Sequence, residues 1–239
     1  MSHLLAVDSV TLQYRANKQL VTATRRVSFH VSESDRYVIL GPSGCGKSTL
    51  LKAVGGYIKP VEGAILLNGA RVTNPGPDRV FVFQEFDQLL PWKTVRQNIA
   101  FALTASGKLN RREADERAMH FVEKVRLTEF ADSYPHTLSG GMKQRTAIAR
   151  GMAMEPKILL MDEPFAALDA LTRARMQEEL LQLWEDTKFT VLFVTHSIPE
   201  ALRVGNRILL LSAHPGEVKA EVDAQDCDEA RIEEILLHA

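Results

Sequence analysis

The chain has 239 residues, of which 45% are hydrophobic and 25% charged. These fractions are typical of a globular protein and exclude a wholly disordered or collagen-like chain. The net charge is -1, so no nucleic-acid partner is expected through a general basic field. Two cysteines, Cys45 and Cys227, exclude a disulfide framework and fit a reducing compartment. No apolar run approaches the roughly 20 residues that span a bilayer, so any link to a membrane is expected through a protein partner.

The first third of the chain is predicted to be rich in β-strands. Residues 5–12 and 27–31 alternate apolar and polar side chains, as half-buried strands do. Residues 37–40 form a short, unbroken apolar strand, which is typical of a parallel sheet buried on both faces. Residues 63–67 form another strand, followed by the tight-turn pair Asn68-Gly69.

The middle of the chain is predicted to be helical. A capping box begins one helix, at Thr94–Gln97, and Asn110–Glu113 begins a second. A shorter helix follows Thr128 and ends before Pro135, and a longer one covers residues 143–154.

Strands and helices alternate after residue 156. Such alternation predicts a parallel sheet covered by helices, into which the helical middle is inserted. The acidic tail from Asp226 carries a short amphipathic segment, predicted to be a surface helix. The strands are expected at 157–161, 189–194 and 207–211, and the helices at 171–184 and from Ser197.

A phosphate-binding loop is predicted at residues 41–49, Gly-Pro-Ser-Gly-Cys-Gly-Lys-Ser-Thr, between a strand and a helix. Glycine is needed at Gly41, Gly44 and Gly46 because backbone N–H groups must turn inward around phosphate oxygens. The N-terminus of the following helix favours the same anion. The pattern predicts binding of a nucleoside triphosphate, without distinguishing a kinase, a GTPase or a motor.

Two side chains of this loop have expected chemical roles. Lys47 can bridge the β- and γ-phosphates, and Ser48 can hold Mg²⁺. Cys45 is interpreted as a small filler, with a reactive thiol at a helix N-terminus as the alternative.

A second strand, residues 158–161, ends in Asp162-Glu163-Pro164. Acids at the end of a buried parallel strand lie at the edge of the sheet where ligands bind. Asp162 is expected to contact the Mg²⁺ shell, and Glu163 to polarise an attacking water. The alternative is a strand followed by a solvated acidic turn.

The segment Leu138-Ser-Gly-Gly-Met142 precedes the long helix, and with it predicts a second helix N-terminus that can bind an anion. Its alternative interpretation is an N-cap with flexible glycines. With these motifs together, the sequence resembles the ATP-binding cassette (ABC) ATPases over residues 14–216. Residues 41–49 match Walker A, residues 158–163 match Walker B, and residues 138–142 match the family signature, with Met142 in place of the usual glutamine.

The resemblance also identifies four single residues. Gln84 is similar to the Q-loop glutamine, Asp169 to the D-loop aspartate, and His196 to the switch histidine, while Tyr14 stands where the family stacks a ring on adenine. In isolation, Gln84 would be interpreted as a polar loop residue, His196 as a strand-end histidine and Tyr14 as a strand-face aromatic.

The resemblance implies a head-to-tail dimer that binds ATP and Mg²⁺ between its two copies. The implied catalytic residues are Glu163, His196, Lys47 and Gln84, and the implied metal ligands are Ser48, Gln84 and Asp162. The implied nucleotide-binding residues are Tyr14, Gly41, Pro42, Ser43, Gly44, Cys45, Gly46, Lys47, Ser48, Thr49, Gln84, Asp162, Ser139, Gly140, Gly141 and Asp169.

The implied fold class is α/β, a P-loop NTPase core with a mainly parallel sheet, an N-terminal antiparallel β subdomain and an inserted α-helical subdomain. Within one ABC ATPase domain spanning 1–239, residues 1–90 and 156–220 are expected to form the core with its β subdomain. Residues 91–155 are expected to form the helical subdomain, and residues 221–239 a C-terminal tail.

The segment 84–92, QEFDQLLPW, places Phe86, Leu89, Leu90 and Trp92 in one predicted loop. So much apolar area favours a partner surface, although a loop folded onto its own helices is the alternative. Residues 74–92 and 162–172 resemble the nitrate/sulfonate/taurine-type importer ATPases of bacteria.

That subfamily likeness implies an importer subunit at the cytoplasmic face of the bacterial inner membrane. It would bind membrane permeases through residues 84–92 and act indirectly with a periplasmic solute-binding protein. The alternatives are a non-transport cassette acting on nucleic acid or ribosomes and, more distantly, a P-loop kinase.

Overall fold

The computed structural model describes residues 3–16, 19–83 and 88–238. The chain forms two compact units, residues 1–79 with 189–239 and residues 80–188. The predicted helical segment 91–155 lies within the second unit, which also takes in residues 156–188.

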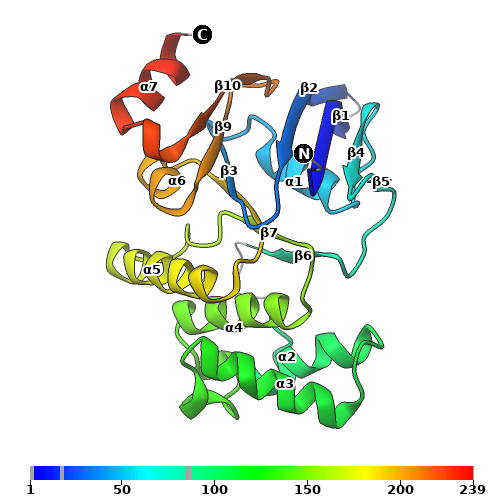
Figure 1. Ribbon diagram of the computed structural model, residues 1–239, viewed down its shortest axis with the longest axis vertical. Coiled ribbons are helices and arrows are strands. Elements are labelled where there is room, and N and C mark those ends of the chain that lie inside the picture. Colours follow the sequence, from blue (N-terminus) through cyan, green and yellow to red (C-terminus); the bar gives the residue numbers. More distant parts are fainter. Residues whose placement is uncertain (1–2, 17–18, 84–87, 239) are drawn as a thin grey trace. The chain divides into compact units, whose positions relative to one another are not determined.

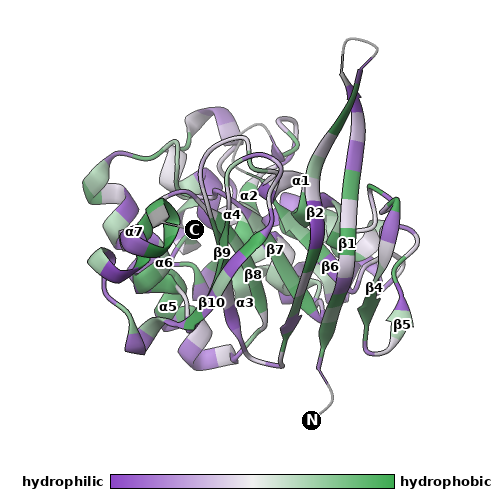
Figure 2. Cartoon of the chain, turned by 90° about the horizontal axis from the view of Figure 1, so that it is seen from above, coloured by the Kyte–Doolittle hydropathy of each residue, from purple (hydrophilic) through white to green (hydrophobic). Residues whose placement is uncertain are grey.

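An antiparallel sheet forms one part of the first unit, with strand order β2-β1-β4-β5. Figure 2 shows β1 and β2 as a long two-stranded ribbon in which hydropathy alternates in bands. Both strands continue beyond the predicted segments, and their register shifts near Val10. Ser9 and Arg26, near these shifts, have positive φ angles of 48° and 45°. The strands are β1 (Leu5–Ala16), β2 (Gln19–Val31), β4 (Glu62–Leu67) and β5 (Ala70–Arg71).

A second sheet of the first unit is parallel at its centre, where β3 (Arg36–Leu40) pairs with both β8 (Val191–Thr195) and β9 (Arg207–Leu211). β10 (Val218–Asp223) adds an antiparallel strand to β9. The predicted α/β class, with a mainly parallel core sheet and an antiparallel N-terminal sheet, is confirmed.

The α-helices in the described residues of this unit are α1 (Lys47–Val54), α6 (Ile198–Val204) and α7 (Glu229–His238). The Ser197 side chain caps α6 by accepting a hydrogen bond from the Glu200 N–H. The predicted tail helix is α7, which contacts α6, β9 and β10, and its residue Ile232 is completely buried.

In the described part of the second unit, α4 contacts the other α-helices α2, α3 and α5. Figure 1 shows α4 lying between α5 and the α2–α3 pair. The predicted capping box at Thr94 is present, and the structure shows a second capping box at Asn110, where a helix start was predicted. The helix expected after Thr128 is only a 3₁₀ turn, Thr128–Phe130. The elements are β6 (Arg79–Val82), α2 (Val95–Ala105), α3 (Arg111–Lys124), a 3₁₀ turn at Pro135–Thr137, α4 (Gly140–Ala153), β7 (Ile158–Asp162) and α5 (Ala170–Thr187).

No helix among the described residues is both long and apolar enough to cross a membrane.

Candidate nucleotide-binding site

The predicted phosphate loop joins β3 to α1 in the first unit. Gly44 and Gly46 have φ angles of 81° and 98°, a region that side chains with a Cβ avoid. At Gly46 a Cβ would also lie only 2.6 Å from the Ala23 carbonyl oxygen on β2. Left-handed residues alternating with ordinary ones turn successive N–H groups to one side, which makes a concave anion site. The local conformation therefore fits the predicted phosphate loop.

Lys47, the first residue of α1, is 4% exposed. Its ammonium donates hydrogen bonds to the carbonyl oxygens of Gly41 and Pro42, at 2.8 and 2.9 Å. These contacts are to uncharged groups and leave the positive charge of Lys47 in place. A buried positive charge beside a helix N-terminus suits an anionic ligand such as a phosphate chain.

The Cys45 thiol is 1% exposed and faces Gly41, where an added Cβ would meet its Sγ at 3.0 Å. Burial raises the pKa of the Cys45 thiol, and the nearby Lys47 only partly opposes that shift. A protonated, enclosed thiol favours the interpretation of Cys45 as a filler over a reactive cysteine.

His196 follows β8 at the same sheet edge as the phosphate loop. Thr195 pairs with Leu40 of β3 in the parallel register, so His196 and Gly41 each follow the last paired residue of adjacent strands. His196 is exposed. The structure thus places the predicted switch histidine beside the beginning of the loop, where ligands of parallel sheets bind.

Tyr14 lies on β1 opposite Val21 of β2 and is 46% exposed. Tyr14 is therefore accessible from solvent, as a ring that stacks on a base must be.

The predicted acid pair lies at the end of β7 in the second unit, and both residues are partly exposed. Glu163 has a φ angle of 43°, which is uncommon for a residue other than glycine. The Glu163 carbonyl accepts a hydrogen bond from the Ala166 N–H at 3.1 Å, and Phe165 is completely buried below this turn. Strained backbone held by a packed turn is common at functional sites.

The signature segment begins α4, and the predicted D-loop begins α5. Ser139 is the N-cap of α4 and accepts a hydrogen bond from the Met142 N–H at 3.3 Å. A Cβ on Gly141 would lie 3.1 Å from Thr172 Cγ2 in the first turn of α5, so the small glycine lets the two helix starts lie side by side. α4 begins three residues earlier than predicted because Ser139 caps it.

Asp169 is the N-cap of α5, and its side chain accepts hydrogen bonds from the N–H groups of Leu171 and Thr172. The hydrogen bonding to Thr172 lowers the pKa of the exposed Asp169 carboxyl. Asp169 therefore stays ionised, and it shapes the turn between β7 and α5.

The predicted Gln84 and Phe86 lie outside the described residues. The residues flanking them are held by contacts that the sequence did not reveal. The Gln88 amide bonds both backbone groups of Phe83, donating to its carbonyl at 2.8 Å and accepting from its N–H at 3.1 Å. Arg150 of α4 donates to the Gln88 carbonyl at 2.7 Å, and burial lowers the pKa of Arg150. The sequence signal for these contacts is weak, since Arg150 is simply an arginine within a predicted helix.

The prediction that Leu89 contributes to an exposed apolar surface is wrong, because Leu89 is only 4% exposed. The Asn98 side chain, completely buried, accepts from the Leu90 N–H and donates to the carbonyls of Leu90, Lys93 and Thr94. These bonds fold the segment inward at Leu89, while Trp92 remains 69% exposed.

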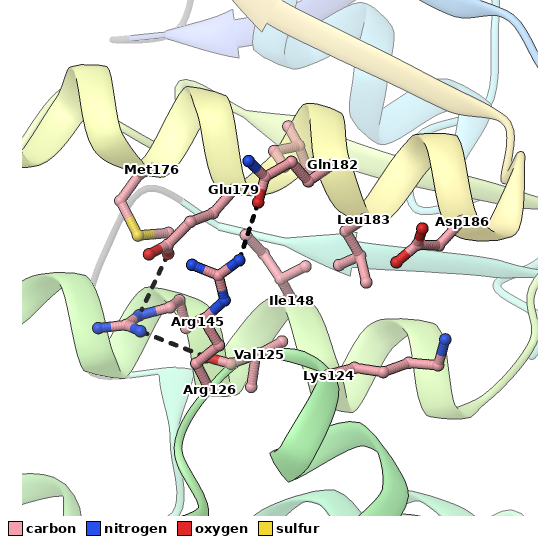
Figure 3. A pocket seen from close by; sticks show the side chains of 11 residues that line it. Lys124, Val125, Arg126, Arg145, Ile148, Met176, Glu179, Gln182, Leu183 and Asp186 are labelled. Atoms are coloured by element: carbon pink, nitrogen blue, oxygen red, sulfur yellow. Dashed lines mark hydrogen bonds and ion pairs between the residues drawn. The ribbon is translucent and has the colours of Figure 1, made fainter.

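A pocket in the second unit lies between the end of α3, α4 and α5 (Figure 3). Several of its polar groups bond one another: Arg126 donates to Gln182, and Arg145 donates to the Val125 carbonyl and forms an ion pair with Glu179. None of the predicted site residues that the structure describes is among those lining it, so we assign it no part in nucleotide chemistry.

A profile described as ABC transporter matches residues 24–166. The taurine import ATP-binding protein TauB of Rhizobium johnstonii is 49% identical over 221 residues, which cover 92% of this chain and 84% of that protein. The aliphatic sulfonates import ATP-binding protein SsuB of Bacillus cereus is 43% identical over 219 residues, covering 92% and 85%.

The structure is similar to a solved structure described as the dimeric structure of MJ0796, a bacterial ABC transporter cassette. The TM-score is 0.79 at 34% identity, covering 92% of this chain and 98% of that one. A dimeric post-hydrolysis state of the same cassette, bound to ADP and Pi, gives a TM-score of 0.78 at 33% identity with the same coverage.

Proposed function

The chain belongs to the ABC transporter family, and we propose that it is the ATP-hydrolysing subunit of a bacterial importer for a small anion of the sulfonate, taurine or nitrate type. The observation that carries this proposal is the 49% identity, over 92% of the chain, to a taurine import ATP-binding protein. The conformation of the phosphate loop and the buried charge of Lys47 support nucleotide binding independently of that likeness.

In the proposed reaction, water attacks the γ-phosphorus of ATP, and ADP leaves with the bridging oxygen. Lys47 and the N–H groups at Gly44 and Gly46 offset negative charge on the phosphates, including charge that develops in the transition state. Glu163 orients the water and accepts its proton, while His196 contacts the γ-phosphate from the edge where β8 ends. Gln84 is proposed as a further catalytic residue and metal ligand because of the family resemblance alone.

Mg²⁺ is the metal proposed to accompany the nucleotide. The Ser48 hydroxyl and the Asp162 carboxylate are hard oxygen donors, which suit this ion, with phosphate oxygens and water completing its shell. Such an ion would supply positive charge against the β- and γ-phosphates.

Two copies of the chain are proposed to close on ATP, with the phosphate loop of one facing Ser139, Gly140 and Gly141 of the other. The N-terminus of α4, capped by Ser139 without an acidic first turn, is suited to phosphate. Two solved structures of one relative, at 33–34% identity, are described as dimeric, which supports this arrangement. Size-exclusion chromatography with ATP should detect the dimer for Glu163→Gln.

The permease is proposed to bind beside Trp92. A hollow next to this residue is lined by Lys93, Phe101 and neighbouring residues of α2 and α3. Phe101 is 43% exposed, and the Lys93 ammonium lies 5.1 Å from its ring centre. Two exposed aromatic residues, Trp92 and Phe101, with basic side chains nearby, suit a short amphipathic helix carrying an apolar anchor. The cassette would lie at the cytoplasmic face of the inner membrane, and the periplasmic binding protein would act only through the permease.

The test is solute uptake in the organism that encodes the chain. Deleting the gene should abolish ATP-dependent uptake of taurine, an alkanesulfonate or nitrate. The wild-type gene should restore uptake, and Glu163→Gln should not. Full uptake of all three solutes in the deletion strain would reject the importer. Co-purification of ribosomes or DNA in place of integral membrane protein would favour the non-transport alternative.

A further inference from the structure

Two segments of the first unit pack against the phosphate loop. They are residues 23–25 of β2 and the turn 212–217 between β9 and β10. The Gly216 N–H donates to the Ala23 carbonyl, and the Gly216 carbonyl accepts from the Arg25 N–H, both at 2.9 Å. Gly216 therefore forms an isolated parallel bridge with Thr24, and β2 ties the turn in place.

The turn is closed internally by Ser212. Its hydroxyl accepts a hydrogen bond from the Glu217 N–H at 2.9 Å, and its hydrogen has the carbonyls of Ala213, at 3.0 Å, and Pro215, at 3.1 Å, as acceptors. The Ser212 N–H also donates to the Glu217 carbonyl at 2.9 Å. These bonds leave Gly216 little freedom to move away from the loop.

Gly216 approaches the phosphate loop so closely that a side chain would not fit. A Cβ on Gly216 would lie 2.2 Å from the Cys45 carbonyl oxygen, and the two atoms would have to separate by about 0.8 Å to reach 3.0 Å. The φ angle of Gly216 is outside the left-handed region, so its backbone conformation alone would accept alanine. The need for glycine comes from the contact with Cys45.

The Cys45 carbonyl shares its peptide unit with the Gly46 N–H. Because a trans peptide is planar, its C=O and N–H groups point in opposite directions. With the C=O toward Gly216, the Gly46 N–H points away from the turn. Gly46 itself lies close to the Ala23 carbonyl of β2, and this contact restricts the position of the Gly46 backbone. Neighbours distant in the sequence therefore hold this peptide unit.

We propose that Gly216 is a positioning residue of the nucleotide site, which sets the direction of the Gly46 N–H toward phosphate through the Cys45 carbonyl. The inference rests on the proposed binding of ATP at this loop. It assigns a role to the β9–β10 turn, which belongs to none of the sequence motifs.

The first test is Gly216→Ala, with affinity for a fluorescent ATP analogue and for ADP measured by titration. Alanine should displace the Cys45–Gly46 peptide unit by up to about 0.8 Å, and a misplacement of that size should raise both dissociation constants by about 10- to 100-fold. The Gly46 amide cross-peak in a ¹⁵N–¹H spectrum should move in the free variant and respond less to ADP. Far-UV circular dichroism should remain that of the wild type. Gly69→Ala is the matched control: Gly69 has a φ angle of 75° and open space at its Cβ position, so it should lose stability while keeping nucleotide affinity.

A second variant, Ser212→Ala, loosens the turn without adding atoms and decides the test if Gly216→Ala does not fold. It should raise the ADP dissociation constant by about 2- to 5-fold and shift the Gly46 cross-peak. Wild-type affinity and an unmoved Gly46 cross-peak in both folded variants would overturn the inference while leaving the proposed function intact. A wild-type chain that binds no ATP would instead reject the proposed function.

Discussion

Alanine substitutions at Gly44 and Gly46 separate two reasons for glycine in the phosphate loop. Both residues have a left-handed backbone conformation, with φ angles of 81° and 98°. A Cβ on Gly44 meets nothing within 4 Å, whereas one on Gly46 would lie 2.6 Å from the Ala23 carbonyl oxygen and 2.8 Å from Thr24 Cγ2. Gly44→Ala therefore tests backbone conformation alone, and Gly46→Ala tests conformation together with crowding against β2.

The expected magnitudes differ accordingly. Alanine in a left-handed conformation costs about 1–2 kcal/mol, so Gly44→Ala should lower the free energy of unfolding by that amount and weaken ATP binding by about 10-fold at most. Gly46→Ala must also displace the loop from β2, and a misplacement approaching 1 Å can weaken a positioned interaction by about 100-fold. Its dissociation constant should exceed that of Gly44→Ala by about 10-fold.

The assay pairs urea unfolding with fluorescence titration of an ATP analogue, so that changes in stability and in affinity are measured on the same protein. Equal dissociation constants for the two folded variants would refute the reasoning. That result would mean that contact with β2 does not shape the loop and that only local conformation matters.

Three further predictions concern the remaining site residues. Glu163→Gln should bind ATP within about 3-fold of wild type and hydrolyse it at least about 100-fold more slowly; near-normal turnover in a phosphate-release assay would remove Glu163 from its role. Trp92→Ser should release the co-purified permease without changing the urea midpoint, whereas Leu89→Ser should cost about 2–4 kcal/mol of stability; a Trp92 variant that retains its permease would argue against this surface. Cys45 should react with iodoacetamide at pH 8 at least about 10-fold more slowly than the partly exposed Cys227, as measured by mass spectrometry of peptides, and equal rates would contradict the buried thiol.

The parts of the fold that could be predicted are those whose signals are local. The unbroken apolar strand of residues 37–40 became the buried β3, and the capping side chains of Thr94 and Asn110 begin the helices they predicted. In each case the signal and its physical cause lie within a few residues. Gly44 belongs to the same class, because its positive φ angle is a requirement of the loop itself and no distant residue crowds it.

Elements that depend on distant partners were missed or shortened. β10 reads VKAEVD, with only part-buried or exposed residues, and its existence depends on pairing with β9. The first two strands are longer than the alternating segments because their outer halves pair mainly with each other. Leu89 was placed on the surface because a run of apolar residues does not reveal that buried Asn98 folds the segment inward.

The same distinction applies to the site. A motif specifies which residues surround a phosphate, but the direction of each N–H depends on what lies behind its peptide unit. For the unit joining Cys45 and Gly46, Gly216 approaches the Cys45 carbonyl, and the Ala23 carbonyl approaches Gly46. Ala23 lies about 20 residues before the loop, and Gly216 lies about 170 residues after it. A chain can therefore keep every residue of the phosphate motif and still bind nucleotide poorly if either distant contact changes, and affinity for ADP should report such a change before stability does.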